Sequence, residues 1–507
     1  MSQETVVAPV TTTGGRDTTR PPDRRRWLAL AVVATAQLMV ILDATVVNIA
    51  LPSAQRALDI SDANRQWIVT AYTLTFGGLL LLGGRIADYF GRKRAFLIGL
   101  IGFAGASALG GAATSGATLF AARALQGAFG ALLAPAALSL IAVTFTEARE
   151  RARAFGVFGA ISGGGAAIGL IAGGLLTEYA TWRWCLLVNI PIALVAFLAA
   201  LLVVRESRAE GNTRYDVPGA LLSTGGLIAL VYGFTKAATE ADHWRSTVTL
   251  SWLGVAALLL VAFVWWESRT THPLLPLRVV LDRNRGVSYL VSILTGAGML
   301  GMFLFMTYYL QLTLGYSALR SGVAYLPFSG GIIVSATIAA QLLPRVGPRV
   351  LMSVGGLLAT ASMAWLTQLD LHSSYVTHIL PSFIGMSVGI GLVFVPLSST
   401  ALSGVGNHDA GVASAMVNTT QQVGGSLGTA LLNTIFTTAV VSYVAGHGAT
   451  PIAQANAAIH GYNVAFTVSA FLLAAGALLA FLFIRKPTEA VVVEEPVEEL
   501  VPEPALA

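Results

Sequence analysis

The sequence predicts an all-α polytopic membrane protein with fourteen transmembrane helices. Of its 507 residues, 55% are hydrophobic and only 11% are charged. The charged residues form short clusters separated by apolar runs of about 20 residues, the length of helix that spans a bilayer. The uneven distribution of Lys and Arg between successive loops supports both the number of spans and their direction.

Each predicted span is an apolar run bounded by charged residues, prolines or glycines. Arg24, Arg25 and Arg26 precede the first run, which is too long for a cleaved signal peptide and is therefore a span, with Pro52 ending its helix at the outer surface. The thirteenth run leaves room for a break or a re-entrant piece. In chain order, the spans are predicted at residues 27–50, 65–84, 95–113, 117–144, 154–177, 184–204, 217–236, 248–267, 287–311, 321–343, 350–369, 378–402, 411–440 and 462–484.

With the N-terminus inside the cell, the basic residues fall mainly on the cytoplasmic side. That side holds 23 of the 30 Lys and Arg residues, the outer loops hold six, and Arg123 lies within a span. Basic residues concentrate in cytoplasmic loops, so we expect a multi-pass protein of the cell membrane, with both termini cytoplasmic. This topology also explains the net charge of +5, and nucleic acid is not expected as a partner. The excess of Arg over Lys hints at a bacterial source.

A weak internal repeat indicates two halves. The stretch GRKRAFLIG at residues 91–99 returns in altered form, as GPRVLMSVG, 256 residues later at 347–355. Two six-helix bundles related by a pseudo-two-fold axis, with the substrate path between them, account for such a repeat. The predicted organisation is a disordered N-terminus at 1–26, an N-terminal bundle at 27–204, a linker with two inserted spans at 205–286, a C-terminal bundle at 287–486 and an acidic tail at 487–507.

Two ionisable side chains, Asp43 and Arg123, lie well inside predicted spans. At 1.5 Å per residue, Asp43 lies about 13 Å and Arg123 about 9 Å from the same outer surface. This similar depth allows them to meet in the central cavity. Burial and a nearby arginine act on the proton affinity of Asp43 in opposite senses, so we expect Asp43 to bind protons and a cationic substrate, with Arg123 tuning it. A static ion pair that only fixes helix packing is the alternative.

Five stretches of the sequence carry motifs: ILDATVVNIALP (41–52), GRIADYFGRKR (84–94), RALQGAFGA (123–131), WRWCLLVNIP (182–191) and NTTQQVGGSLG (418–428). Together they resemble the major facilitator superfamily and, within it, the fourteen-span drug:proton antiporters. The resemblance covers roughly residues 27–486. It implies the major facilitator fold, with two six-helix bundles and two inserted central helices.

By this resemblance, the loop after the second span takes part in conformational gating. Gly84 lets two helices approach, Gly91 makes the tight turn, and Arg92 helps to anchor the loop inside the cell. Asp88 has no obvious partner nearby in the sequence. The resemblance implies that it docks against the N-terminal end of a helix in the opposite half and latches the outward-facing state. A plain positive-inside loop would explain the basic residues but not the spacing of Gly84, Asp88 and Gly91.

The fifth span resembles the antiporter motif but departs from it at one position. Gly165, Gly169 and Gly173 recur every four residues, and such small residues allow close helix packing in lipid. We assign them to gating as well. Leu170 stands where the motif has proline, which leaves the span less kinked, weakens the case for proton antiport and leaves the effect on coupling open.

Polar, aromatic and Met residues in several spans are candidates to line a substrate path. Met adapts to varied apolar shapes, and amide and hydroxyl groups can hydrogen-bond a ligand or one another. Ordinary packing and lipid contacts are the alternative. The candidates are Gln37, Asn48, Tyr72, Gln126, Met302, Phe305, Tyr309, Asn418, Gln421 and Gln422.

The sequence predicts a transporter rather than an enzyme, with no cofactor and no metal. Cys185 is the only cysteine, so neither an intrachain disulfide nor a Cys-rich metal site can form. None of the three lysines completes a phosphate-binding loop, which argues against a primary pump. We expect proton-coupled efflux of hydrophobic or cationic drugs or antibiotics by alternating access. The alternatives are a facilitator or importer of another small molecule, and a non-transporting receptor or scaffold.

Overall fold

The computed structural model describes residues 24–145, 147–208, 216–240, 242–271, 273–405, 410–448 and 450–485, and all its regular structure in these ranges is helical. Thirteen described helices are long and apolar enough to cross a bilayer. With α5, a further helix of 32 residues, the described chain has the fourteen long helices that the sequence predicts. Both predicted tails, 1–26 and 487–507, lie almost wholly outside the described residues.

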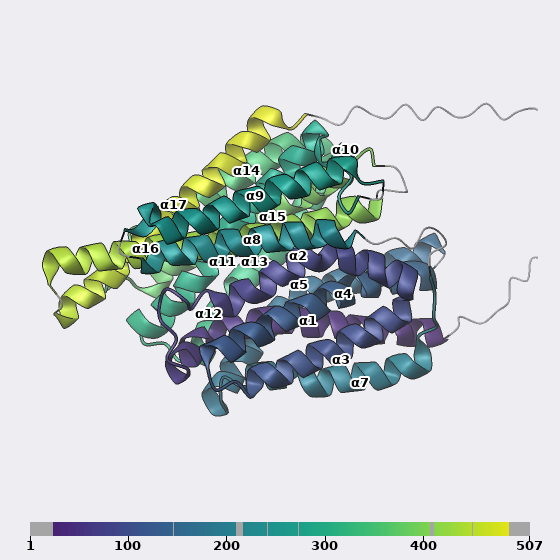
Figure 1. The fold of residues 1–507 in the computed structure, drawn as a ribbon, viewed down its shortest axis with the longest axis horizontal. Coiled ribbons are helices and arrows are strands. Elements are labelled where there is room, and N and C mark those ends of the chain that lie inside the picture. Colours follow the sequence, from purple (N-terminus) through teal and green to yellow (C-terminus); the bar gives the residue numbers. More distant parts are fainter. Residues whose placement is uncertain are drawn as a thin grey trace, which may run out of the picture.

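The first half of the chain forms one layer of the molecule (Figure 1). Its helices are α1 (Arg24–Ala57), α2 (Trp67–Phe90), α3 (Arg92–Gly111), α4 (Gly116–Thr144), α5 (Ala148–Tyr179), α6 (Trp184–Leu187) and α7 (Asn189–Val203).

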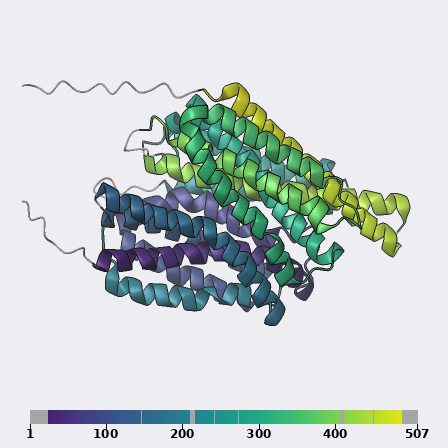
Figure 2. The same cartoon turned by 180° about the vertical axis from the view of Figure 1, so that it is seen from behind.

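The second half forms the other layer, which is also seen from behind in Figure 2. Its helices are α11 (Arg283–Tyr308), η2 (Tyr309–Thr313), α12 (Ala318–Ala324), α13 (Leu326–Val346), α14 (Pro348–Leu366), η3 (Tyr375–Ile379), α15 (Leu380–Leu402), α16 (Ala410–His447) and α17 (Pro451–Phe483).

The inserted pair lies at the seam between the halves. It consists of α8 (Val217–Thr239) and α9 (Thr247–Arg269), joined by η1 (His243–Arg245) and followed by α10 (Leu277–Val280). Helix α8 packs against α2 of the first half and α16 of the second. Helix α9 packs mainly on α8 and exposes large apolar side chains such as Leu258, Val261 and Trp265, as expected for a helix that faces lipid. This arrangement confirms the predicted fold of two bundles with two inserted helices.

Two helices run further than the sequence suggested. Helix α1 continues through Pro52 to Ala57, so the prediction that Pro52 ends the helix was wrong. A proline inside a helix removes one backbone hydrogen bond, and burial of Leu51 and Ala54 on either side of Pro52 offsets that loss. Helix α16 is continuous over 38 residues, without the break that its length allowed.

Tight turns at corresponding places support the internal repeat. Gly91 joins α2 to α3 with φ of 125°, and Gly347 joins α13 to α14 with φ of 84°. Both values lie in the left-handed region that only glycine adopts readily. Next to Gly91, the Glu206 carboxylate accepts hydrogen bonds from the backbone amides of Lys93 and Arg94, at the positive end of α3.

Close helix contacts occur at glycines, although not always the predicted ones. A Cβ on Gly173 would lie 2.9 Å from the backbone oxygen of Val46, and one on Gly169 would strike the Thr45 side chain, which confirms the expected close packing of α5 on α1. For α2 against α4, the prediction at Gly84 was wrong. A Cβ there would meet only the Pro135 side chain at 3.5 Å, whereas one on Gly83 would lie 2.1 Å from the Ala131 backbone oxygen.

The two halves are joined at their outer ends, the side that the charge pattern assigns to the cell exterior. Gln311 donates to the Ile49 backbone oxygen at 2.8 Å, and the Leu319 amide donates to Glu178 at 2.9 Å. One apolar core runs through the outer ends of both halves, whereas separate clusters fill the inner end of each half. The structure is therefore closed on the outer side.

This closure depends on the close backbone approach of α5 to α12. One added methyl group at that contact should therefore push the two helices apart. In Gly322→Ala, the new Cβ would lie 2.3 Å from the Leu170 backbone oxygen, so α5 and α12 must separate by at least about 1 Å to restore ordinary contact. Spin labels on cysteines at the exposed Leu175 and Val323 should report longer distances in this variant.

The matched control is Gly330→Ala, because a Cβ on Gly330 meets nothing within 4 Å. The control should leave the distance distribution between the labels unchanged. An unchanged distribution in Gly322→Ala would contradict the assignment of this contact to outer closure.

Candidate functional site

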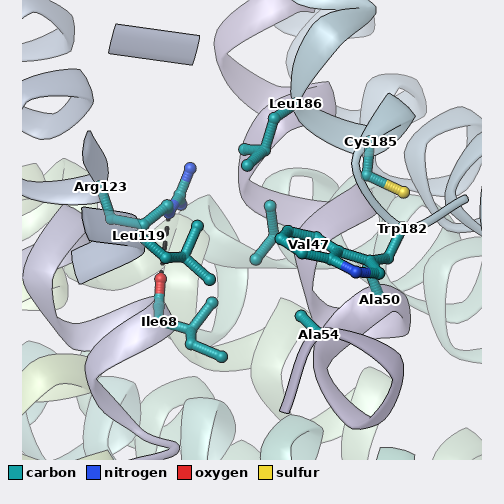
Figure 3. A pocket seen from close by; sticks show the side chains of 9 residues that line it. All are labelled: Val47, Ala50, Ala54, Ile68, Leu119, Arg123, Trp182, Cys185 and Leu186. Carbon is teal, nitrogen blue, oxygen red and sulfur yellow. Dashed lines mark hydrogen bonds between the residues drawn. The ribbon is translucent and has the colours of Figure 1, made fainter. Parts of the chain in front are cut away.

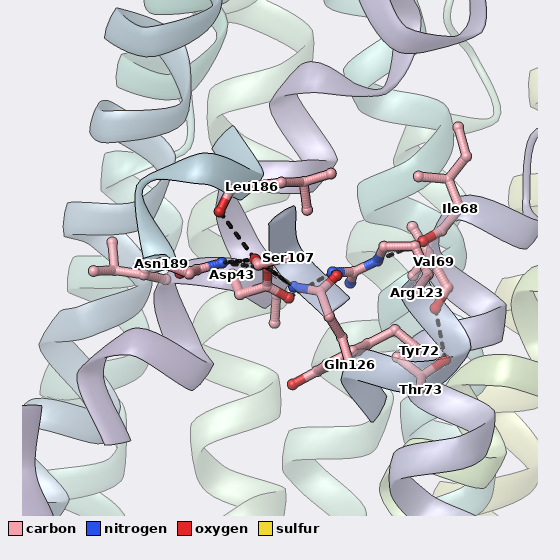
Figure 4. A network of polar contacts seen from close by, with 12 residues as sticks. Asp43, Ile68, Val69, Tyr72, Thr73, Ser107, Arg123, Gln126, Leu186 and Asn189 are labelled. Atoms are coloured by element: carbon pink, nitrogen blue, oxygen red, sulfur yellow. Dashed lines mark hydrogen bonds and ion pairs between the residues drawn. The ribbon is translucent and has the colours of Figure 1, made fainter. Parts of the chain in front are cut away.

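The two charged groups predicted inside the membrane meet in a buried ion pair. Arg123 on α4 contacts the Asp43 carboxylate on α1, with 2.6 Å between Nη1 and Oδ2 (Figure 4). Each residue is only 1% exposed. An ion pair so deeply buried is stable only when further hydrogen bonds satisfy the remaining polar atoms.

The second oxygen of Asp43 is held by two side-chain amides. Gln126 Nε2 on α4 lies 2.9 Å from Asp43 Oδ1, and Asn189 Nδ2 at the start of α7 lies 2.8 Å from the same atom. Both amides also donate to Ser107 Oγ on α3, at 2.8 and 2.9 Å, and Ser107 donates to the Leu186 backbone oxygen. The carboxylate therefore ties α1 to α4 and α7, and through Ser107 to α3.

The guanidinium of Arg123 is fixed from three further directions. Its Nε donates to the Ile68 backbone oxygen at 3.0 Å, and its Nη1 donates to Gln126 Oε1 at 2.8 Å. The ring of Tyr72 lies 4.4 Å from Arg123 Cζ, within the range of a cation–π interaction. The arginine thus fastens α4 to α2 as well as to α1.

The location of the pair corrects one expectation. All its partners come from α1 to α7, so the pair lies inside the first bundle and not in a cavity between the two halves. The sequence correctly predicted that Asp43 and Arg123 lie at similar depth. It did not predict that the Asp43 side chain points into the first bundle. In this conformation the carboxylate is sealed from water, and proton exchange requires these helices to move.

A small cavity adjoins the pair on its outer side (Figure 3). It has a volume of about 10 Å³ and is lined by Arg123 and eight residues of α1, α2, α4 and the segment that leads into α7. Because its exposed lining is apolar, it lacks the polar partners that an ordered water needs. The lining residues are Val47, Ala50, Ala54, Ile68, Leu119, Arg123, Trp182, Cys185 and Leu186.

Ser107 and Asn189 were missed as site residues by the sequence analysis. Asn189 carried a signal, because it belongs to the WRWCLLVNIP motif, but the motif gave it no role. Ser107 carried none: a serine in an apolar span usually bonds its own helix backbone. Only the packing of α3 against α6 and α7 brings its hydroxyl to this network.

Asp88 of the predicted gating loop makes its contacts within its own half. Asp88 accepts from Arg92, with 3.0 Å between Oδ1 and Nε, and from Ser139 on α4 at 3.4 Å. The expectation that Asp88 has no partner nearby in the sequence was therefore wrong, because Arg92 follows one turn later. Docking onto a helix of the opposite half is not seen in this outer-closed conformation.

The candidate substrate residues are scattered rather than gathered around one cavity. Asn48 donates to the Ala44 oxygen of its own helix, and Tyr309 donates to the Asp370 backbone oxygen. Gln421 lines a second small cavity between α11, α15 and α16. The remaining candidates fall into three groups by exposure: Tyr72, Gln126, Met302 and Phe305 are buried, Gln37 and Gln422 are partly buried, and Asn418 is exposed.

The described residues contain no group of three or more His, Cys, Asp and Glu side chains that could hold a metal ion. The charged groups of the site are the Asp43 carboxylate and the Arg123 guanidinium, which lie in a sealed hydrogen-bond network.

Comparison of the sequence with known proteins identifies the family of the chain. Residues 33–429 match the profile of the Major Facilitator Superfamily. The puromycin resistance protein pur8 of Streptomyces alboniger is 54% identical over 473 residues, covering 92% of this chain and 93% of that protein. The cephamycin export protein CmcT of Amycolatopsis lactamdurans is 40% identical, covering 80% of this chain and 84% of that protein.

Solved structures agree on the fold. A bacterial homolog of the human lysosomal transporter Spinster, solved in an inward-facing and unoccupied conformation, superposes with a TM-score of 0.65 at 16% sequence identity. The match covers 91% of this chain and 97% of that one.

The geometry predicts that the effect of removing one of the two charges on protein stability depends strongly on whether the other charge is present. Arg123→Met should destabilise the protein by about 3–5 kcal/mol, because it leaves the Asp43 carboxylate buried without its partner. Adding Asp43→Asn should restore a large part of that loss. Equilibrium unfolding in mixed micelles at pH 8 measures the free energy of unfolding of Arg123→Met, Asp43→Asn and the double variant against wild type.

The partly exposed pair Arg26–Glu150, at 2.9 Å, provides the control. The same cycle made with Arg26→Met and Glu150→Gln should cost no more than about 1 kcal/mol. Simple addition of the two single effects at Asp43 and Arg123 would show that the charges do not depend on one another.

Proposed function

The chain belongs to the major facilitator superfamily, and we propose that it exports hydrophobic or cationic drugs or antibiotics in exchange for protons by alternating access. The family consists of transporters and not enzymes. Two relatives that cover most of the chain bear names that refer to antibiotic resistance or export. These relatives support a small organic molecule as cargo and a bacterial cell membrane as the location. The concentration of Lys and Arg in alternate loops supports cytoplasmic termini.

The buried pair is the single observation that supports proton coupling. Asp43 is the proton site in this proposal, and Arg123 tunes it. While Asp43 is ionised, it holds Arg123, Gln126 and Asn189 together. Protonation removes the negative charge, so the positive charge of Arg123 is left unmatched inside the bundle, which costs several kcal/mol unless the helices rearrange. Loading a proton therefore drives a change in the packing of α1 against α4.

Helix α1 carries that change to the outer closure. Ile49 and Gln55 lie on the same helix as Asp43, within about four turns on its outer side. Ile49 accepts from Gln311, and Gln55 accepts from Tyr308. A shift of α1 thus changes the contacts between the halves. For exchange, drug bound to the unprotonated protein opens the outer side, and a proton taken up from the outside returns α1 to the outer-closed position after the drug has left. Proton and drug compete because they favour opposite positions of α1.

The residues assigned to gating act at two places in this cycle: the inner turn between α2 and α3, and the contact of α5 with α1. Gly91 shapes the inner turn, and Asp88 and Arg92 are free to exchange partners there when the halves rock. The stripe of Gly165, Gly169 and Gly173 lets α1 slide on α5 with little steric resistance, since the contact has small residues on one side.

A change that removes only the charge of Asp43 tests this function. In everted membrane vesicles, wild-type protein should dissipate an imposed pH gradient when drug is added. Asp43→Asn should abolish that response, because the asparagine amide cannot take up and release the proton. Acridine fluorescence measures the gradient, and radiolabelled puromycin serves as the drug.

The control applies the same chemical change to Asp59, an exposed outer carboxylate with φ of 49°, a conformation that Asn tolerates. Asp59→Asn should transport like wild type. Coupled efflux in Asp43→Asn would refute the assignment of the proton site. Drug flux that ignores the pH gradient in the wild type would favour a facilitator, and binding without flux would favour a receptor.

A further inference from the structure

A second buried arginine, Arg65, lies at the outer end of the seam between the halves. It lies two residues before the start of α2 and is only 2% exposed. Its Nε donates to Asn433 Oδ1 on α16 at 3.0 Å, and its Nη1 lies 3.4 Å from the Asp62 carboxylate. Its Nη2 is buried and has no hydrogen-bond partner among the described residues. Arg65 is one of the six basic residues that the charge pattern assigns to the outer loops.

The charge of Arg65 is matched mainly by aromatic rings. The guanidinium carbon lies 4.2 Å from the ring centre of Tyr308, 4.6 Å from that of Phe436 and 5.9 Å from that of Phe305. The Asp62 side chain is 59% exposed, so water screens its attraction for the arginine. Ring faces attract cations most strongly where water is excluded, and here they provide most of the compensation.

The rings keep their arrangement through contacts with one another. Phe305 stacks on Phe436 with 5.3 Å between ring centres, and Tyr462 lies 5.1 Å from Phe436 and 6.2 Å from Phe305. None of these contacts involves Arg65. We call Phe305, Tyr308, Phe436 and Tyr462 the aromatic cage. Phe305, Phe436 and Tyr462 contact one another and do not need the arginine to hold their arrangement, and the Tyr308 hydroxyl donates to Gln55 of the first half.

Cage and cation belong to different halves of the protein. All four rings lie on α11, α16 and α17, whereas Arg65 lies in the first half. Opening the outer side separates the halves, so Arg65 must leave the rings, which then face the outer opening. An empty aromatic cage of this kind binds organic cations.

We propose that the cage of Phe305, Tyr308, Phe436 and Tyr462 is an exit site for the cationic group of the drug, which it holds in the outward-open state in place of Arg65. The inference rests on the proposed export function and names the chemistry of its substrate: an amine, guanidine or other organic cation. The cage cannot hold both cations. The return of Arg65 therefore expels the drug to the exterior as the outer side closes, and the bound drug delays closure until it leaves.

Binding of tetraphenylphosphonium, a permanent organic cation, tests the cage directly. The protein is placed in lipid nanodiscs without any proton gradient, so the result does not depend on proton coupling. Arg65→Gln removes the internal competitor and should tighten binding about tenfold or more, the scale of one desolvated cation–π contact. Phe436→Leu in the Arg65→Gln background should abolish that gain, and Phe436→Tyr, which keeps the ring, should retain it.

The matched control is Arg183→Gln. Arg183 also lies at the outer side over an aromatic ring, 4.5 Å from that of Trp182, and donates to the Ala113 oxygen, but all three residues belong to the first half. This variant should bind the cation like wild type. Equal binding in wild type and Arg65→Gln, or a gain that survives Phe436→Leu, would overturn the exit site. A thermal melt of each variant establishes that the protein is folded.

Failure of the exit site is distinguishable from failure of the proposed function. If cation binding ignores Arg65 and Phe436 while Asp43-dependent efflux persists, only the exit site is wrong. If the predicted binding differences are found but no proton-linked flux occurs, the cage exists and the export mechanism is wrong.

Discussion

The cost of keeping ionised groups inside a helical bundle surrounded by lipid governs the rest of this structure. Asp43 meets that cost through Arg123 at 2.6 Å and through the amides of Gln126 and Asn189. Its partners lie on α4 and α7, and Ser107 adds α3. Because one carboxylate holds several helices, changing its charge alters helix packing and not merely one side chain. In the proposed function, this is the physical basis for coupling a proton to a movement of the bundle.

At the seam between the halves, the charged groups are compensated more weakly. The charge of Arg65 is balanced by rings and by an exposed carboxylate rather than by a buried one, and the Leu319–Glu178 contact lies at the surface. The buried ion pair thus lies within one half, whereas the seam holds a cation matched by rings together with neutral hydrogen bonds such as Asn433 to Gln66 and Thr73 with Ser426. Such a distribution favours movement of the halves as nearly rigid bodies about a separable outer seam.

Much of the fold could be predicted from the sequence, because a bilayer imposes a length and a charge bias on every span. The end of α1 could not, since one lost hydrogen bond at Pro52 is outweighed by packing that the sequence does not display. For the site, depth predicted that Asp43 and Arg123 could meet. The side of the helix on which they meet depends on how α1 packs against α4 and α7. The role of Ser107 depends on the packing of α3 against α6 and α7, and that of Arg65 on contacts with the opposite half. No local pattern reports that packing.

The central claim is that Asp43 carries the proton that drug binding displaces. Measuring proton release from the purified protein in weakly buffered detergent, with a pH-sensitive dye, tests it most directly. Adding puromycin to wild-type protein should release protons over a window of pH, and the release should vanish in Asp43→Asn that still binds puromycin. Equal proton release from wild type and a drug-binding Asp43→Asn variant would contradict the account.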